Sequence, residues 1–60
     1  DLSNNERMMC AYLKMNLLTK EIAPLLNISV RGVETIRYRL RKKFGLERED
    51  SLTDYLSNQL

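Results

Sequence analysis

The sequence predicts an all-α domain of four helices, and three observations lead to that prediction. Apolar residues recur at intervals of three and four, residues that favour helix starts precede each apolar run, and no stretch alternates between apolar and polar residues as a strand does. A chain of 60 residues is one domain at most. Because so short a chain hides only about 60% of the surface of its unfolded form, we expect close packing and no large catalytic cleft.

The first helix is predicted over about residues 4–15. Ser3 and Glu6 have the spacing of a capping box, in which a hydroxyl and a carboxylate satisfy backbone N–H groups at a helix start, and Leu2 can act as a hydrophobic staple. Asn16 favours a left-handed end to this helix. The residues expected on its apolar face are Met8, Met9, Tyr12 and Leu13.

A second, short helix is expected to follow, capped by Thr19. Pro24 lies beyond its first turn, where it removes one backbone hydrogen bond and crowds the Lys20 carbonyl, so we expect a kink or a shortened helix. Asn27 suits the tight turn that comes next. The apolar residues of this helix are Ile22, Ala23, Leu25 and Leu26.

The third helix is predicted from Val30 to Phe44, with Ser29 as its N-cap and Gly45 as its C-terminal cap. At about 100° per residue, its core side consists of Val33, Ile36, Leu40 and Phe44. Its opposite side consists of Arg31, Thr35, Tyr38 and Lys42, with Glu34 and Arg41 along one flank and Arg39 along the other.

The last helix is predicted after Leu46, capped by Asp50 or Ser51. Asp50 and Asp54 near its start complement the positive end of the helix dipole. Its apolar stripe consists of Leu52, Tyr55, Leu56 and Leu60.

Positive charge is concentrated in one segment of the chain. The formal net charge is only +2, but residues 31–46 hold six Lys and Arg residues against the single acid Glu34. Such a patch attracts polyanions, which makes nucleic acid the first partner to consider; the alternative is a solvated helix face without a ligand. Arg37 lies nearest the apolar side, and we expect its guanidinium to pair with a carboxylate such as Glu6 or Glu21.

Residue counts exclude several classes of function. The chain has no His and one Cys, so the usual zinc sites, the Ser-His-Asp and Cys-His systems and an internal disulfide cannot form. We therefore expect neither an enzyme nor a metal or other cofactor. Cys10 is expected to be a small buried apolar group, with a redox role as the alternative. No apolar run approaches the roughly 18 residues of a membrane span, so a soluble domain is expected.

Residues 19–36 have the pattern of a helix-turn-helix. Two helices joined by a three-residue turn must cross steeply, and their close approach needs a small side chain, here Ala23. In DNA-binding proteins with this pattern the second helix lies in the major groove and the first crosses the phosphate backbone. The apolar residues that flank the turn and face the core are Ile22, Leu26, Ile28, Val33 and Ile36.

Several blocks of residues have the order and spacing of a known family. They are Leu2, Ser3 and Glu6; residues 19–23, Thr-Lys-Glu-Ile-Ala; residues 26–29, Leu-Asn-Ile-Ser; Val33 and Leu40; and residues 43–46, Lys-Phe-Gly-Leu. Through these blocks the sequence, from Leu2 to about Leu56, resembles the LuxR-type (GerE-like) helix-turn-helix domains of bacterial transcription regulators. The resemblance implies a four-helix domain whose third helix reads double-stranded DNA.

The resemblance also implies roles for individual positions. The base-facing positions are Glu34, Thr35 and Tyr38. The residues assigned to phosphate contacts, from the resemblance and from the basic flanks of the third helix, are Lys20, Ser29, Arg31, Gly32, Arg39, Arg41, Lys42 and Lys43. The fourth helix, through Leu52, Tyr55 and Leu56, is the implied homodimer contact.

Domains of this family usually form the C-terminal part of a response regulator of a two-component system or of a ligand-sensing protein. The resemblance therefore implies that the chain is a fragment of a longer regulator, with a sensor or receiver domain in the same chain. It implies a bacterial cytoplasmic location, with the parent protein either free or tethered to a membrane by another part. No small-molecule substrate is expected for this segment.

Two departures from the family pattern, together with one unusual residue, keep a second hypothesis open. Glu34 stands where the family commonly has Lys; it repels phosphate but can accept a hydrogen bond from the cytosine amino group, so an altered sequence preference is expected. Gly32 replaces a Thr and leaves a bare N–H near a helix N-terminus, where an anion can approach. Together with Pro24, these residues motivate the alternative of a helical protein-interaction or dimerisation module that kept the fold but lost DNA binding.

Overall fold

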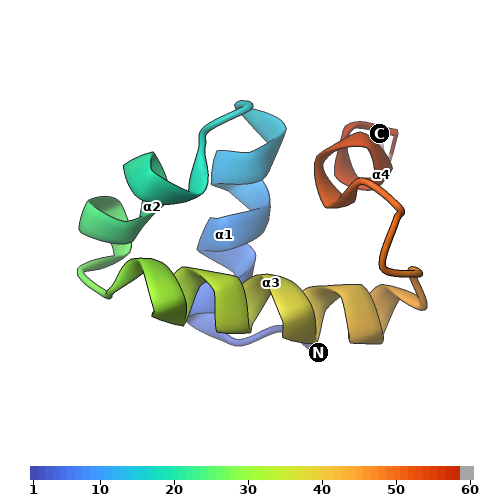
Figure 1. Ribbon diagram of the computed structural model, residues 1–60, viewed down its shortest axis with the longest axis horizontal. Helices are drawn as coiled ribbons and strands as arrows, with labels where there is room; N and C mark the ends of the chain where they lie inside the picture. Colours follow the sequence, from blue (N-terminus) through green and yellow to red (C-terminus); the bar gives the residue numbers. More distant parts are fainter. Residues whose placement is uncertain (59–60) are drawn as a thin grey trace.

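The longest helix, α3 (Val30–Phe44), runs along one side of the molecule, and the other helices pack against it (Figure 1). The structure, a computed structural model, describes residues 1–58. Helix α1 (Asn4–Lys14) contacts all three other helices, whereas α2 (Thr19–Leu26) and α4 (Leu52–Ser57) lie over opposite ends of α3 and do not contact each other. Residues 1–58 form four helices and no strand, which confirms the predicted all-α class.

The helix starts of α1, α3 and α4 have the caps that the sequence predicts. The Ser3 N–H donates to Oε1 of Glu6 at 2.8 Å and the Glu6 N–H donates to Oγ of Ser3 at 3.2 Å, which completes the capping box. Ser29 Oγ and Ser51 Oγ accept the corresponding backbone hydrogen bonds of α3 and α4 at 3.0 and 3.1 Å. These three helices therefore begin where local side-chain chemistry satisfies their first N–H groups.

The ends of α1, α2 and α3 are also as predicted. Asn16, Asn27 and Gly45 have positive φ angles of 66°, 59° and 69°. This left-handed conformation turns the chain away from the helix axis, and Asn and Gly adopt it at the lowest cost. Helix α1 ends at Lys14, one residue earlier than expected, and the bounds of α3 agree with the prediction.

The start of α2 corrects one prediction. Thr19 is not the N-cap but the first helical residue, and Leu18 occupies the cap position with extended backbone. No side chain accepts the first N–H groups of α2, and Oε1 of Glu21 instead accepts the N–H of the cap residue Leu18 at 2.7 Å, which is the reciprocal half of a capping box. The helix continues past Pro24 and spans eight residues, so it is short, in agreement with the expectation for a proline in its interior.

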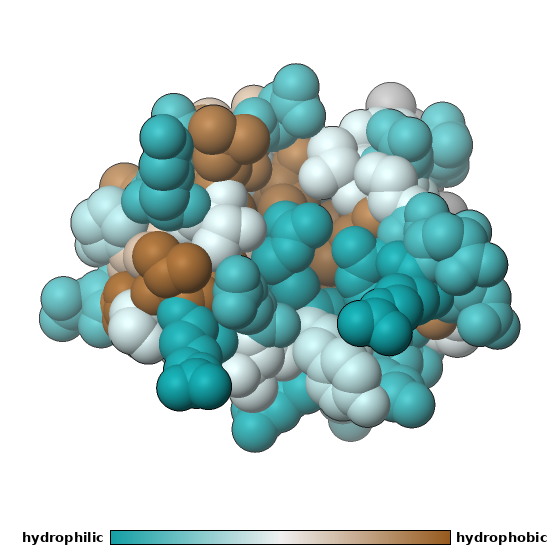
Figure 2. Space-filling view, viewed as in Figure 1, coloured by the Kyte–Doolittle hydropathy of each residue, from teal (hydrophilic) through white to brown (hydrophobic). Residues whose placement is uncertain are grey.

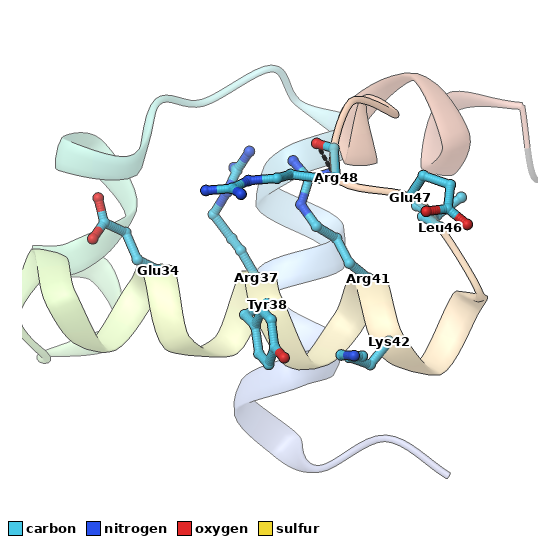
Figure 3. A pocket seen from close by; sticks show the side chains of 8 residues that line it. All are labelled: Glu34, Arg37, Tyr38, Arg41, Lys42, Leu46, Glu47 and Arg48. Carbon is cyan, nitrogen blue, oxygen red and sulfur yellow. Dashed lines mark hydrogen bonds between the residues drawn. The ribbon is translucent and has the colours of Figure 1, made fainter.

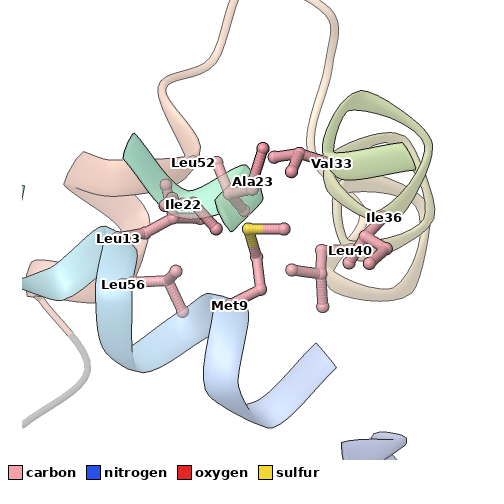
Figure 4. Close-up of a cluster of buried hydrophobic side chains, with 9 residues drawn as sticks. All are labelled: Met9, Leu13, Ile22, Ala23, Val33, Ile36, Leu40, Leu52 and Leu56. Carbon is pink, nitrogen blue, oxygen red and sulfur yellow. The ribbon is translucent and has the colours of Figure 1, made fainter. Parts of the chain in front are cut away.

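One hydrophobic core lies between the four helices, and each helix contributes to it (Figure 4). Met9 extends into the middle of the cluster from α1, and the predicted stripe of α3 closes one side of it. Each fully buried side chain of the size of Met, Leu, Ile or Val contributes about 1.5–3 kcal/mol to the stability of the fold. The core residues are Met9, Leu13, Ile22, Ala23, Val33, Ile36, Leu40, Leu52 and Leu56.

Two residues predicted for apolar faces lie outside the core. Leu25 is 54% exposed and Met8 is 43% exposed. At 100° per residue, each projects well away from the buried direction of its helix, which is set by Ile22 and Ala23 in α2 and by Met9 in α1. The proposed extension of the α4 stripe to Leu60 lies outside the described residues. None of the helices of residues 1–58 is both long and apolar enough to cross a bilayer.

A nearly buried carboxylate joins α1 to the end of α3. Glu6 Oε1 lies 2.8 Å from Nζ of Lys43, and the Glu6 side chain is 7% exposed. Hydrogen bonds from Lys43 and from the Ser3 N–H lower the pKa of Glu6, although burial opposes them. The expected pairing of Arg37 with Glu6 or Glu21 is therefore wrong, because Glu6 pairs with Lys43 and neither carboxylate lies within 4.0 Å of the Arg37 guanidinium.

Candidate nucleic-acid interface

The turn between α2 and α3 fixes how these two helices meet. Asn27 is left-handed, with φ 59° and ψ 41°, and the Ile28 N–H donates to the Ala23 carbonyl at 3.0 Å. The next residue, Ser29, already caps α3. Ala23 is buried beside Val33 in the core, so a small side chain lies where the helices approach each other (Figure 4). The structure thus joins two contacting helices by a tight turn at the residues where the sequence pattern indicates one.

The outer face of α3, defined here as the exposed residues Arg31, Glu34, Thr35, Tyr38, Arg39 and Lys42, points away from the core. The Tyr38 ring is 60% exposed, and Nζ of Lys42 lies 5.4 Å from its centroid, within the range of a cation–π contact. Thr35 Oγ1 donates to the Arg31 carbonyl at 3.1 Å and keeps its oxygen free to accept. The three candidate base-facing residues therefore share one accessible surface.

Four of the eight residues assigned to phosphate contacts have free positions. Arg31, Arg39 and Lys42 are exposed along α3, and Lys20 is exposed in the first turn of α2. Both helices of the motif thus carry cations that solvent can reach. A duplex placed against the outer face would meet positive charge from each of them.

The remaining assigned residues are engaged within the chain. Ser29 Oγ accepts the Gly32 N–H at 3.0 Å, so that N–H is not available to an anion while the cap is formed. Lys43 is held by Glu6, although its side chain is 42% exposed. Arg41 donates from Nη1 to the Asp50 carbonyl and thereby fastens the loop between α3 and α4. The cap at Ser29 is the predicted one, whereas the structural roles of Arg41 and Lys43 were not predicted from the sequence.

A hollow of about 650 Å³ opens beside the outer face, between α3 and the loop that leads to α4 (Figure 3). We call it the arginine hollow, because the side chains of Arg37, Arg41 and Arg48 extend to the same side of α3. Arg48 reaches back from the loop toward Arg37. The hollow is lined by Glu34, Arg37, Tyr38, Arg41, Lys42, Leu46, Glu47 and Arg48.

Two of the three arginines of this hollow were not predicted as site residues. Arg37 was expected to form an ion pair, and Arg48 was not assigned to any site. A signal existed for Arg37, since Arg37 and Arg41 are four residues apart and share one flank of α3. No such signal existed for Arg48, because it follows α3 in a loop where helical periodicity gives no direction.

Apolar side chains are exposed near α2. Leu18 is 58% exposed, and Leu25 and Val30 are also classed as exposed. Figure 2 shows hydrophobic surface over the α2 region of this face and hydrophilic side chains across its middle. The surface beside the helix-turn-helix is therefore mixed, with an apolar part at α2 and a polar part along α3.

The three residues expected to form a dimer contact pack within the chain. Leu52 is completely buried and Leu56 is 5% exposed. The Tyr55 ring stacks on Phe44, with 4.9 Å between the ring centroids. In α4 the exposed positions are instead Asp54 and Ser57.

Two further kinds of site, a metal centre and a reactive thiol, can be compared with the structure. Within residues 1–58, no group of three His, Cys, Asp or Glu side chains is arranged to hold a metal ion. Burial raises the pKa of the half-buried Cys10 thiol, and the nearby Glu6 carboxylate acts in the same direction. A raised pKa reduces the thiolate fraction, which disfavours a reactive cysteine.

No family model, curated protein or solved structure compared with the chain gives a match.

Proposed function

We propose that this chain binds double-stranded DNA sequence-specifically, with α3 in the major groove. The observation that carries the proposal is the outer face of α3, which is exposed and rich in cations while the opposite side of the same helix is buried against three other helices. A helix-turn-helix uses such a division, because its second helix must present polar side chains outward and remain fixed from behind.

The dimensions of α3 suit this task. Its 15 residues correspond to about 22 Å at 1.5 Å per residue, and the major groove, about 12 Å wide, admits one helix. Base edges would be met by Glu34, Thr35 and Tyr38 in the middle of the helix. Exposed cations lie on both sides of these residues along the helix, which is the arrangement needed to hold phosphates on either side of a groove.

Glu34 supports a specific preference at one base position. Its carboxylate is exposed on the outer face and accepts hydrogen bonds only. Among base edges in the major groove, the cytosine amino group is a donor that a carboxylate can select. We therefore propose that Glu34 reads a C·G pair and that a base without a donor there is rejected.

The wider role is proposed from the family resemblance. The chain would act as the output domain of a bacterial transcription regulator that carries a sensor or receiver domain elsewhere. It would bind two half-sites as a homodimer through α4. Because Leu52 and Leu56 are buried, the dimer contact would use the exposed side of α4 around Asp54 and Ser57.

One observation favours a second candidate function, a protein-interaction module. Leu18, Leu25 and Val30 are exposed near the helix-turn-helix, and exposed apolar side chains of this size often mark protein contacts. The acidic Glu34 in the outer face would also weaken attraction to phosphate. In this hypothesis the fold is retained and the apolar surface near α2 is the functional one.

Selection of bound sequences from a pool of random duplex DNA, followed by a salt titration on the selected duplex, distinguishes the two functions. DNA binding predicts enrichment of a motif with two half-sites. Four phosphate contacts per protomer predict a slope of about −3.6 per bound protomer for log K against log salt concentration, and about twice that for a dimer on two half-sites. No enrichment and no detectable binding at low salt would reject the proposal and favour the interaction module.

A further inference from the structure

Three arginines of the arginine hollow converge without a carboxylate to neutralise them. Among residues 1–58, the ion pair within 4.0 Å is that of Lys43 with Glu6, which lies outside the hollow. The hollow is lined by four cationic side chains and by two acidic ones, Glu34 and Glu47. Figure 3 places the Glu34 carboxylate toward one end and Glu47 at the other, so the guanidinium groups occupy the middle.

The close approach of like charges is electrostatically unfavourable, and Arg37 shows this. This side chain is half-buried, and burial together with the neighbouring charge of Arg41 lowers its pKa. A guanidinium that is partly desolvated next to another guanidinium gains more from an incoming anion than an isolated surface arginine does. The site is therefore prepared for an anion.

The fold holds two of the three arginines in place from different elements. Arg41 is fixed by its hydrogen bonds to the carbonyls of Arg48 and Asp50, so the loop that carries Arg48 is tied to α3. Asp50 Oδ2 also accepts the Glu47 N–H at 2.8 Å, which closes the loop on itself. The backbone of Arg48 is thus tied to α3, and its side chain extends to the same side of α3 as that of Arg37 (Figure 3).

From this geometry we infer that the arginine hollow is a phosphate-binding site in which Arg37 and Arg48 donate to the phosphate oxygens and Arg41 positions the loop. Guanidinium groups present parallel N–H donors that match phosphate oxygens in pairs. The inference deepens the proposed function and rests on it for one source of phosphate. The hollow lies on a flank of α3, where a DNA strand beside the major groove would pass; the other source is a free polyphosphate compound.

The first experiment titrates the chain with inorganic tripolyphosphate at low salt and follows the arginine Nε–Hε signals by NMR. We expect the signals of Arg37, Arg41 and Arg48 to shift together, and those of Arg31 and Arg39 to shift much less. Arg48→Gln should lower the affinity for tripolyphosphate by about tenfold or more, because it removes charged hydrogen bonds. Lys14→Gln, which removes one charge from an exposed position on α1, is the matched control.

Equal effects of Arg48→Gln and Lys14→Gln, or shifts spread evenly over all the arginines, would overturn the inference. Arg48 is exposed and donates no hydrogen bond within residues 1–58, so its substitution leaves the core intact. Arg37→Gln provides a second test from α3 itself, and it should weaken tripolyphosphate binding in the same way.

The second experiment measures duplex DNA binding by the same variants and separates this inference from the proposed function. If DNA fills the hollow, Arg48→Gln weakens binding to all sequences alike and reduces the salt slope by about one. If tripolyphosphate binds the hollow but DNA does not bind the chain, the phosphate site stands and the proposed function fails. If DNA binds and neither arginine substitution alters either ligand, the proposed function stands and the phosphate site is rejected.

Discussion

Nζ of Lys43, in the last turn of α3, lies 2.8 Å from Oε1 of Glu6, in the first turn of α1. The same ammonium donates to the carbonyl of Asp1, also at 2.8 Å. Glu6 in turn accepts the Ser3 N–H that begins α1. One carboxylate thus serves both a helix cap and a contact between two helices that are distant in sequence.

This contact predicts how stability depends on pH. The pKa of Glu6 is lowered in the folded chain from its ordinary value of 4.5, so its contribution to stability is present above pH 4.5 and is lost as the pH falls through the folded-state pKa. Glu6→Gln should therefore reduce the fall in urea midpoint between pH 5 and pH 3. Glu49→Gln, in the exposed loop before α4, is the control, and an unchanged acid dependence in Glu6→Gln would contradict the prediction.

Replacing each of the two glycines by alanine should change the free energy of unfolding in opposite directions. A Cβ at Gly32 would meet Ile28 Cδ1 and Ser29 Oγ at 3.4 Å, which are ordinary contacts, so Gly32→Ala should stabilise α3 by about 0.5–1 kcal/mol. Gly45 has φ +69°, and Gly45→Ala should destabilise the chain by about 1–2 kcal/mol although the space is open. Thermal unfolding measures both, at about 4–8 °C per kcal/mol. Shifts of the same sign would contradict the assignment.

Substitution of Leu52 should destabilise the folded chain itself and not only a contact between two copies of the chain. Because its side chain is completely buried, Leu52→Ala should lower the free energy of unfolding by about 2–5 kcal/mol. Urea unfolding at several protein concentrations tests this, since a core effect persists at the lowest concentration. Ser57→Ala, on the exposed side of α4, should leave unfolding nearly unchanged. A loss of stability in Leu52→Ala only at high concentration would instead assign the residue to a dimer contact.

Two substitutions in the outer face of α3 should affect DNA binding differently, one through affinity and the other through sequence preference. Lys42→Ala removes a cation that lies over Tyr38 and should weaken binding to all duplexes alike. Glu34→Lys should instead change which sequence is preferred, each base contact being worth about 1–3 kcal/mol. Selection from a random duplex pool with each variant gives both results. The same motif after Glu34→Lys would remove that residue from the base contacts.

Much of the fold follows from local sequence signals. Ser29 and Gly45 mark the two ends of α3 because a capping hydroxyl and a left-handed glycine act within one turn of the helix. The helical spacing of Val33, Ile36 and Leu40 likewise predicts which side of α3 is buried, because residues three and four apart lie on the same side of a helix. Thr19 is an exception, since α2 begins one residue earlier than this signal indicates, at the cap residue Leu18, which has no capping side chain.

Contacts between helices could not be derived in this way. Periodicity gives the side of a helix on which Lys43 or Arg37 lies, but not which helix passes that side or at what height. Glu6 therefore received the wrong partner in the sequence analysis. Arg48 was missed because its position depends on the loop that Arg41 holds to α3, which is a tertiary contact.

The buried stripe of Val33, Ile36 and Leu40 also fixes the rotation of α3 about its own axis, because these side chains must face the core. Turning the helix by one residue, about 100°, would withdraw these side chains from the core and bring charged groups into it. Rotation of α3 about its axis is therefore strongly unfavourable. The same residues consequently always face outward, in the same positions around the helix. Because the outward residues do not contribute to the core, a single one of them, such as Glu34, can be exchanged without disturbing the packing of α3.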